Sequence, residues 1–165
     1  MHRKALEIRI RTLGEDRPDV VSKYYNMAGV LGSQGKLDDA MELYGKALEI
    51  YKKTLGEDHP DVADTYNNMA SVLDSQGKLD DAMELHRKAL EIRIRTLGED
   101  RPDVASTYYN MAGVLGSQGK LDDAMELYGK ALEIYKKTLG ENHPDVADTY
   151  NNMANVLDSQ GKLDE

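Results

Sequence analysis

The chain has no cysteine and no tryptophan among its 165 residues. Without cysteine it forms no disulfide and offers no thiolate to a metal ion. No apolar run approaches the roughly 18 residues that a membrane-spanning helix needs. The first residues lead directly into an amphipathic pattern, without the apolar segment of a signal peptide. These absences predict a soluble, cytoplasmic protein that has no membrane partner.

Positive charge is also in short supply. The chain has 21 Lys and Arg residues against 30 Asp and Glu residues, which gives a net charge of −9. An acidic surface repels nucleic acid and anionic lipid, and it favours basic or neutral partners. We therefore expect no nucleic-acid partner.

Catalytic motifs are missing as well. No serine stands in a nucleophile motif, and the chain has no glycine-rich phosphate loop. His59 and His143 fall at expected helix starts, and His86 replaces a tyrosine expected in the core. Without any recognisable set of catalytic residues, we predict that the protein is not an enzyme and needs no metal or cofactor.

The sequence does contain an internal repeat. The motif Gly14–Val20 recurs three times, each time 42 residues further on, at 56–62, 98–104 and 140–146. A second period is twice as long, because residues 1–81 and 85–165 differ at only six positions. A fixed period of this size indicates an array in which each repeat buries its apolar face against its neighbours.

Within one repeat, the pattern predicts two helices. The first has apolar or small residues at helical spacing, namely Val62, Tyr66, Met69, Ala70 and Leu73. Pro60 marks its start, and Gly77 allows the left-handed conformation after its last turn. Asp80 is expected to cap the second helix, which continues to Leu97. Each repeat is thus predicted to be a helical hairpin, and the fold class to be all-α.

Other repeat architectures have a similar period. A β-propeller blade fits poorly, because no strand alternation is present and the tryptophan of its usual signature is absent. HEAT and armadillo repeats fit the helices but not the pattern of small residues. Close helix packing requires small residues, and alanines recur at positions 28, 70, 112 and 154, at 40, 82 and 124, and at 5, 47, 89 and 131.

That small-residue pattern resembles the tetratricopeptide repeat. The 42-residue length is similar to the repeats of the kinesin light chain family, as are the segments Ala47-Leu48-Glu49-Ile50, Leu55 to Ala63, Asn67-Asn68-Met69-Ala70 and Gln76-Gly77-Lys78. The resemblance covers the whole chain and implies an α-α superhelix, a solenoid of antiparallel hairpins. We expect a single array with a half-repeat at 1–14, repeats at 15–56, 57–98 and 99–140, and a half-repeat at 141–165.

In the tetratricopeptide family, the first helix of each hairpin lines a concave groove. Carried over by position, the resemblance implies a peptide-binding row of polar and aromatic residues, namely Asn26, Asn68, Asn110, Asn152, Tyr25, Asn67, Tyr109, Asn151, Asp64, Asp74, Asp148 and Asp158. An asparagine recurs once per hairpin, and its amide both donates and accepts hydrogen bonds. It either binds the backbone of an extended peptide, bonds a neighbouring helix, or was simply copied by duplication. The aspartates favour basic or neutral peptides.

Four glycines at 29, 32, 113 and 116 lie inside predicted helices, where each costs roughly 1 kcal/mol relative to alanine. Either something approaches the backbone closely there, or the array is stable enough to tolerate the loss.

The functional prediction is a protein–protein interaction scaffold that binds an extended segment in the groove. The alternative is a structural, self-assembling array without a dedicated ligand, which the near-identity of the 84-residue copies favours. Its end-to-end contact would join copies of buried positions on two molecules, namely Ala5, Leu6, Ile8, Tyr150, Met153, Ala154 and Leu157. Such a head-to-tail contact need not close and can propagate.

Overall fold

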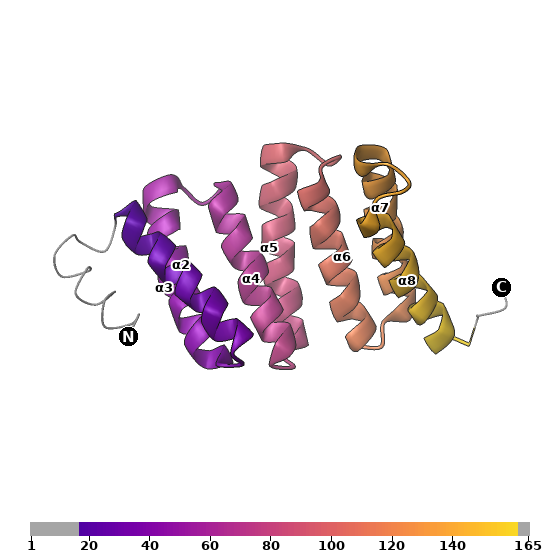
Figure 1. The fold of residues 1–165 in the computed structure, drawn as a ribbon, viewed down its shortest axis with the longest axis horizontal. Helices are drawn as coiled ribbons and strands as arrows, with labels where there is room; N and C mark the ends of the chain where they lie inside the picture. Colours follow the sequence, from indigo (N-terminus) through magenta and orange to yellow (C-terminus); the bar gives the residue numbers. More distant parts are fainter. Residues whose placement is uncertain (1–16, 162–165) are drawn as a thin grey trace. The chain divides into compact units, whose positions relative to one another are not determined.

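The computed structural model describes residues 17–161, which form seven α-helices and no strand. The helices are α2 (Pro18–Ser33), α3 (Leu37–Leu55), α4 (Pro60–Ser75), α5 (Leu79–Leu97), α6 (Pro102–Ser117), α7 (Leu121–Leu139) and α8 (Pro144–Ser159) (Figure 1). The helices of 16 residues, α2, α4, α6 and α8, each begin at a proline, as the sequence predicts. The chain divides into two compact units between Leu85 and His86, and each is described by itself.

Glycine ends both kinds of helix. Gly77 follows α4 with a φ of 78°, and Gly98 follows α5 with a φ of 88°. Both angles are disfavoured for residues that carry a Cβ. After α4, the Lys78 N–H donates to the carbonyl of Leu73 at 2.9 Å, the long-range bond of a Schellman turn. These turns end the helices where the sequence predicts a glycine turn.

One expected cap is wrong. Asp80 lies inside the first turn of α5 and not at its N-cap, because the helix already begins at Leu79. The equivalent Asp38 of α3 accepts a hydrogen bond from Gln76 Nε2 at 2.7 Å, so it joins the start of α3 to the end of α4. A carboxylate in the first turn is also stabilised by the helix dipole.

In the N-terminal unit, α2 and α3 pack as a hairpin, and α4 packs on α3. Alanines 28, 40 and 47 have no exposed surface and let the helices approach closely. The larger core side chains around them are Val20, Val21, Tyr24, Leu43, Tyr44, Ile50 and Val72.

The C-terminal unit repeats this packing, with α6 on α7 and α8 on α7. Its core includes Val104, Ala105, Ala131, Ile134, Tyr135 and Val146. Predicted small and large positions therefore contribute to the core of both units, although Tyr150 and Ala154 of α8 are exposed.

Candidate functional site

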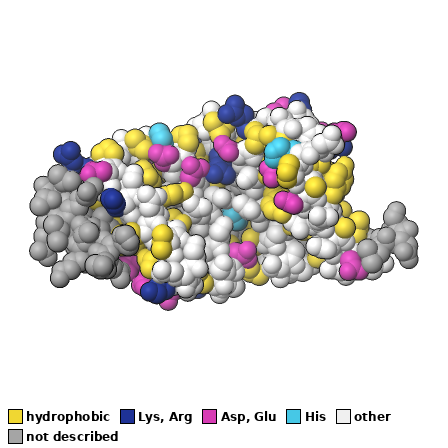
Figure 2. Space-filling model, viewed as in Figure 1, with side chains coloured by type: hydrophobic (Ala, Val, Ile, Leu, Met, Phe, Trp, Pro, Cys, Tyr) yellow, Lys and Arg dark blue, Asp and Glu magenta, His cyan; other side chains and the backbone are white. Residues whose placement is uncertain are grey.

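A hollow of about 600 Å³ opens on the N-terminal unit, where α2 and α4 meet. Its lining combines two aromatic rings, one aliphatic side chain and several neutral polar groups, namely Tyr25, Asn26, Gly29, Val30, Ser33, Gln34, Tyr44 and Asn68. None of these described residues carries a charge. Figure 2 shows one face of the molecule, on which Lys and Arg side chains in dark blue and Asp and Glu side chains in magenta are scattered among white and yellow atoms.

A hydrogen bond crosses this hollow. Asn68 Nδ2 of α4 donates to the Tyr25 hydroxyl of α2 at 2.5 Å. The C-terminal unit has the same bond, from Asn152 Nδ2 to the Tyr109 hydroxyl, also at 2.5 Å. Two of the four predicted asparagines therefore bond a neighbouring helix, which is one of the alternatives that the sequence leaves open. The sequence signal for this pairing is that only alternate hairpins have a tyrosine at the groove position, at 25 and 109, where the other hairpins have Asn67 and Asn151.

The Tyr25 ring lies within a cluster of three tyrosines. Its centroid is 5.6 Å from that of Tyr44 and 6.5 Å from that of Tyr51, in edge-to-face arrangements. Burial is the main cause that raises the pKa of Tyr44, and the neighbouring Tyr25 is the second cause. Burial also raises the pKa of Tyr51, and the carboxylates of Asp61 and Asp64 add to the shift. The Tyr44 and Tyr51 hydroxyls thus remain neutral hydrogen-bonding groups around neutral pH.

The other predicted groove residues differ in exposure. Asn26 is exposed on α2, and Asn67 and Asn68 are half-buried on α4. In the C-terminal unit Asn110 and Asn152 are half-buried, whereas Asn151 is exposed. Of the four aspartates, Asp64 is half-buried. The other three are exposed, namely Asp74, Asp148 and Asp158.

The helical glycines are not required by contacts within the protein. A Cβ on Gly29 would meet the Tyr44 hydroxyl at 3.7 Å, an ordinary contact, and one on Gly32 would meet nothing within 4 Å. Gly113 and Gly116 have equivalent surroundings, with a nearest contact of 3.8 Å at Gly113. In the described part of the chain, alanine therefore fits at all four positions.

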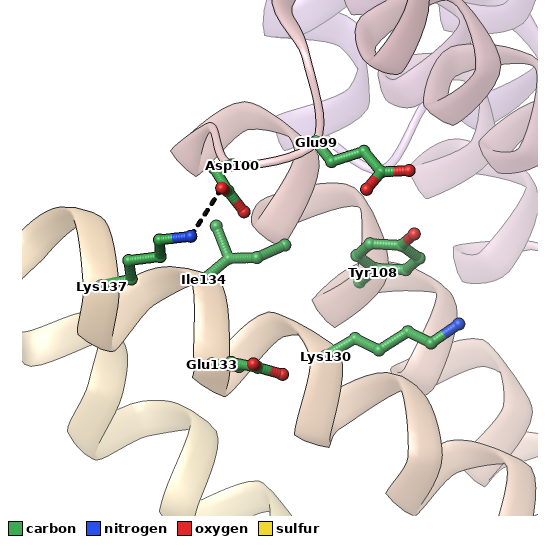
Figure 3. Close-up of a pocket in the computed structure, with 7 residues that line it drawn as sticks. All are labelled: Glu99, Asp100, Tyr108, Lys130, Glu133, Ile134 and Lys137. Carbon is green, nitrogen blue, oxygen red and sulfur yellow. Dashed lines mark hydrogen bonds and ion pairs between the residues drawn. The ribbon is translucent and has the colours of Figure 1, made fainter.

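A second hollow, of about 330 Å³, lies between α6 and α7 (Figure 3). There Lys137 Nζ and Asp100 Oδ2 form an ion pair at 2.7 Å, and Lys130 Nζ lies 5.5 Å from the centroid of the Tyr108 ring. Both partners of the ion pair are mostly exposed, and such pairs add little to stability. The lining thus mixes acidic and basic side chains, since Glu99 and Glu133 also line it.

The histidines have structural positions. His59 and His143 are the N-caps of α4 and α8, where each Nδ1 accepts the N–H two residues on at 3.1 Å. His86 is 1% exposed, and its burial, with the Arg93 charge as a second cause, lowers its pKa to about 4. All three therefore serve helix starts or packing. Among residues 17–161 no cluster of three or more His, Asp or Glu side chains is placed to hold a metal ion.

The apolar face of α8 differs from its copy on α4. Tyr150 is 49% exposed, whereas Tyr66 is 8% exposed. Ala154 is likewise exposed, whereas Ala70 has no exposed surface. Met153 and Leu157 are half-buried. The opposite side of the expected contact, Ala5, Leu6 and Ile8, lies outside the described residues.

The family model of the tetratricopeptide repeat matches the chain at residues 1–53, 19–95, 65–137 and 103–165. The chain belongs to the tetratricopeptide repeat family. Its fold class is accordingly the all-α, α-α superhelix class, as the repeat pattern predicts. Proteins built from these repeats generally mediate protein–protein interactions and are typically non-enzymatic scaffolds.

Solved structures agree with this assignment. BtubC (BKLC) from P. vanneervenii is 30% identical, with a TM-score of 0.85 over 99% of this chain, and the chain spans 65% of its length. A putative kinesin light chain from Podosopora anserina with nearly identical TPR-like repeats is 23% identical, with a TM-score of 0.83 over 98% of this chain and 76% of that one. RapI is 20% identical, with a TM-score of 0.83 over 97% of this chain and 56% of that one.

A comparison with curated protein sequences gives no match. Within the described helices, none is both long enough and apolar enough to cross a membrane.

Proposed function

We propose that the protein is an interaction scaffold that binds an extended segment of a partner on α2 and α4 of the N-terminal unit, and on the equivalent α6 and α8 of the C-terminal unit. The observation that carries the proposal is the uncharged hollow in the N-terminal unit, because it combines aromatic rings with amide groups. Binding sites typically combine an apolar lining with a few polar groups that fix orientation. The repeating elements of this scaffold are proposed to be residues 15–56, 57–98 and 99–140, between the half-repeats 1–14 and 141–165.

The charge around the surface supports a basic or neutral partner. Asp64 and Asp74 lie on α4, and the chain as a whole carries a net charge of −9. Lys23 is the one Lys or Arg residue within α2, so an acidic segment would meet few opposite charges on this helix. Complementary charge mainly raises the association rate and selects between partners.

Titration of a peptide library that varies in charge, followed by fluorescence anisotropy, tests the proposal. We expect basic and neutral peptides to bind more tightly than acidic ones. Asn26→Ala and Asn68→Ala should each weaken binding, by about ten-fold where the amide contacts the peptide backbone. Lys46→Ala, at an exposed position of α3, is the control and should leave affinity unchanged. A preference for acidic peptides, or equal affinity in all variants, would contradict the proposal.

A second candidate function is a self-assembling array. The exposed Tyr150 and Ala154 on α8 favour it, because their copies on α4 are buried. A second copy of the chain offers residues 2–13, which are identical to residues 86–97. Docking of one molecule's α8 on that segment of the next would be a heterologous contact that propagates.

A further inference from the structure

We propose that the hollow on α2 and α4 takes a proline-rich segment in the polyproline II conformation. The inference rests on the proposed binding function and names the class of segment that is bound. The juxtaposition that carries it is the Tyr25 ring, which contacts Tyr44 and Asn68, in a hollow that Gly29 of α2 also lines.

The first argument concerns backbone hydrogen bonds. The walls of the hollow are α-helices, whose own backbone groups are already paired, so no strand edge is available to a bound peptide. Every polar backbone group of the segment must then find a side chain or water. Proline has no N–H, and a polyproline II segment has outward carbonyls without internal partners. Such a segment needs donors for its carbonyls and few acceptors.

The lining supplies donors of this kind. Asn26 is exposed and makes no hydrogen bond with the described residues, so both of its amide protons are available. Asn68 uses one Nδ2 proton for the Tyr25 hydroxyl and retains the second. The Gln34 amide adds two further donors at the rim. The hollow thus offers several neutral donors to the carbonyls of an extended segment.

The second argument concerns the aromatic wall. The Asn68 bond fixes the Tyr25 hydroxyl, and the edge contacts with Tyr44 and Tyr51 fix its ring. A ring held in place before binding loses little conformational entropy on binding. Proline rings are apolar and rigid, and they pack well on aromatic side chains. Val30, which is 55% exposed, extends the apolar surface.

The third argument concerns the glycines. Gly29 and Gly32 lie inside α2, and each costs about 1 kcal/mol of helix stability relative to alanine. Alanine would fit at both positions without a close contact inside the protein. Gly29 lines the hollow, so its absent side chain leaves the α2 backbone open there to a bound segment, whereas Gly32 lies outside the lining. A loss of stability at a site of close approach is typical of functional positions.

Fluorescence anisotropy with two labelled, neutral peptides of equal length tests the inference on the full chain. One peptide alternates proline with glutamine, and the other has alanine in place of each proline. We expect the proline peptide to bind at least about ten-fold more tightly. The substitution Gly29→Ala, at the glycine that lines the hollow, should weaken its binding by about ten-fold while raising the thermal midpoint of unfolding.

Gly45→Ala is the matched control, because Gly45 is a helical glycine of α3 with open space around it and outside the hollow. It should raise the thermal midpoint without weakening binding. Equal affinity for the two peptides, or unchanged binding by the Gly29→Ala variant, would overturn the inference and leave peptide binding itself intact. If no peptide of a charge-varied library binds either, the proposed function fails together with the inference.

Discussion

Buried polar side chains distinguish α5 from α3. His86 and Arg93 stand 42 residues after Tyr44 and Tyr51, so two tyrosine positions carry ionisable nitrogen groups instead. His86 is 1% exposed and Arg93 is 8% exposed. The His86 Nδ1 makes no hydrogen bond in the described part of the chain. An unsatisfied buried polar atom costs stability, so mutation of His86 or of the partners of Arg93 should change the free energy of unfolding measurably.

The low pKa of His86 makes stability depend on pH. The folded pKa is about 4, below the ordinary histidine value of 6.5, so the unfolded chain binds the proton first as pH falls. The contribution of His86 is therefore fully present above about pH 6.5 and is lost as pH falls towards about 4, by on the order of 3 kcal/mol. Urea unfolding of the parent chain and of His86→Tyr across this range measures it. The variant should lose less stability on acidification, because it lacks the histidine. The carboxylates titrate in both proteins, so their effect cancels in the comparison, and parallel curves would contradict the assignment.

The buried Arg93 side chain is hydrogen-bonded to a threonine. Its Nη1 donates to Thr107 Oγ1 at 2.7 Å and to the carbonyl of Asp103 at 3.2 Å. Thr107→Val removes one of these acceptors from a buried cation. Thr149→Val is the matched control, because Thr149 is equally buried and donates to the carbonyl of Asp145.

The Thr107 variant should lose about 1–3 kcal/mol more than the Thr149 variant in urea unfolding. Equal losses would mean that the Arg93 bond contributes nothing.

At the scale of single helices, the four proline-initiated helices differ in their N-caps. His59 and His143 accept a backbone N–H with their side chains, whereas Arg17 and Arg101 make no such bond. Arginine has no acceptor atom and cannot cap. Half of these helices therefore begin without a side-chain partner for their first N–H groups.

A capping residue should stabilise α6. Arg101 has a φ of −119° and a ψ of 142°, the extended conformation that an N-cap requires. Arg101→Asp should therefore raise the free energy of unfolding by about 1 kcal/mol. His143→Asp, which replaces one cap with another, should have a smaller effect in the same urea titration. If both substitutions change stability equally, capping is not the cause.

At the scale of the whole molecule, the 84-residue copies give the two units the same bonds between helices. The tyrosine–asparagine bond occurs in each unit, and so does the bond from Gln76 to Asp38, as Gln160 to Asp122. Identical sequence does not give identical exposure, however. Ala70 is buried, whereas its copy Ala154 is exposed. The exposed apolar face of α8 is where association between copies is predicted.

Ala154→Glu tests that association. The parent chain should show a sedimentation coefficient that rises with concentration, and the variant should remain monomeric, because a buried unpaired carboxylate is strongly unfavourable. Met153→Glu and Leu157→Glu should act in the same way. Asn151→Glu adds the same charge at an exposed position of the same helix and should leave association unchanged. A parent chain that stays monomeric at every concentration would exclude the self-assembling array.

The sequence by itself determined the helices and the positions that pack between them. Prolines at 60 and 144 begin helices, and Gly77 and Gly98 end them, because these effects act within a few residues of the backbone. The 42-residue period and the spacing of alanines likewise predicted the hairpins. The cap at Asp80 was misplaced, because helix starts shift by a residue without changing the periodic pattern.

Only the tertiary structure decided how the predicted groove residues are used. Tyr25 and Asn68 are 43 residues apart, and their bond depends on how α2 and α4 pack. The low pKa of His86 and the open hollow beside Gly29 also arise from packing between helices. Exposure follows the same rule, since Tyr66 and Tyr150 lie in nearly identical local sequences and differ from 8% to 49%. Local sequence sets backbone conformation, whereas burial and pairing depend on neighbours that are distant along the chain.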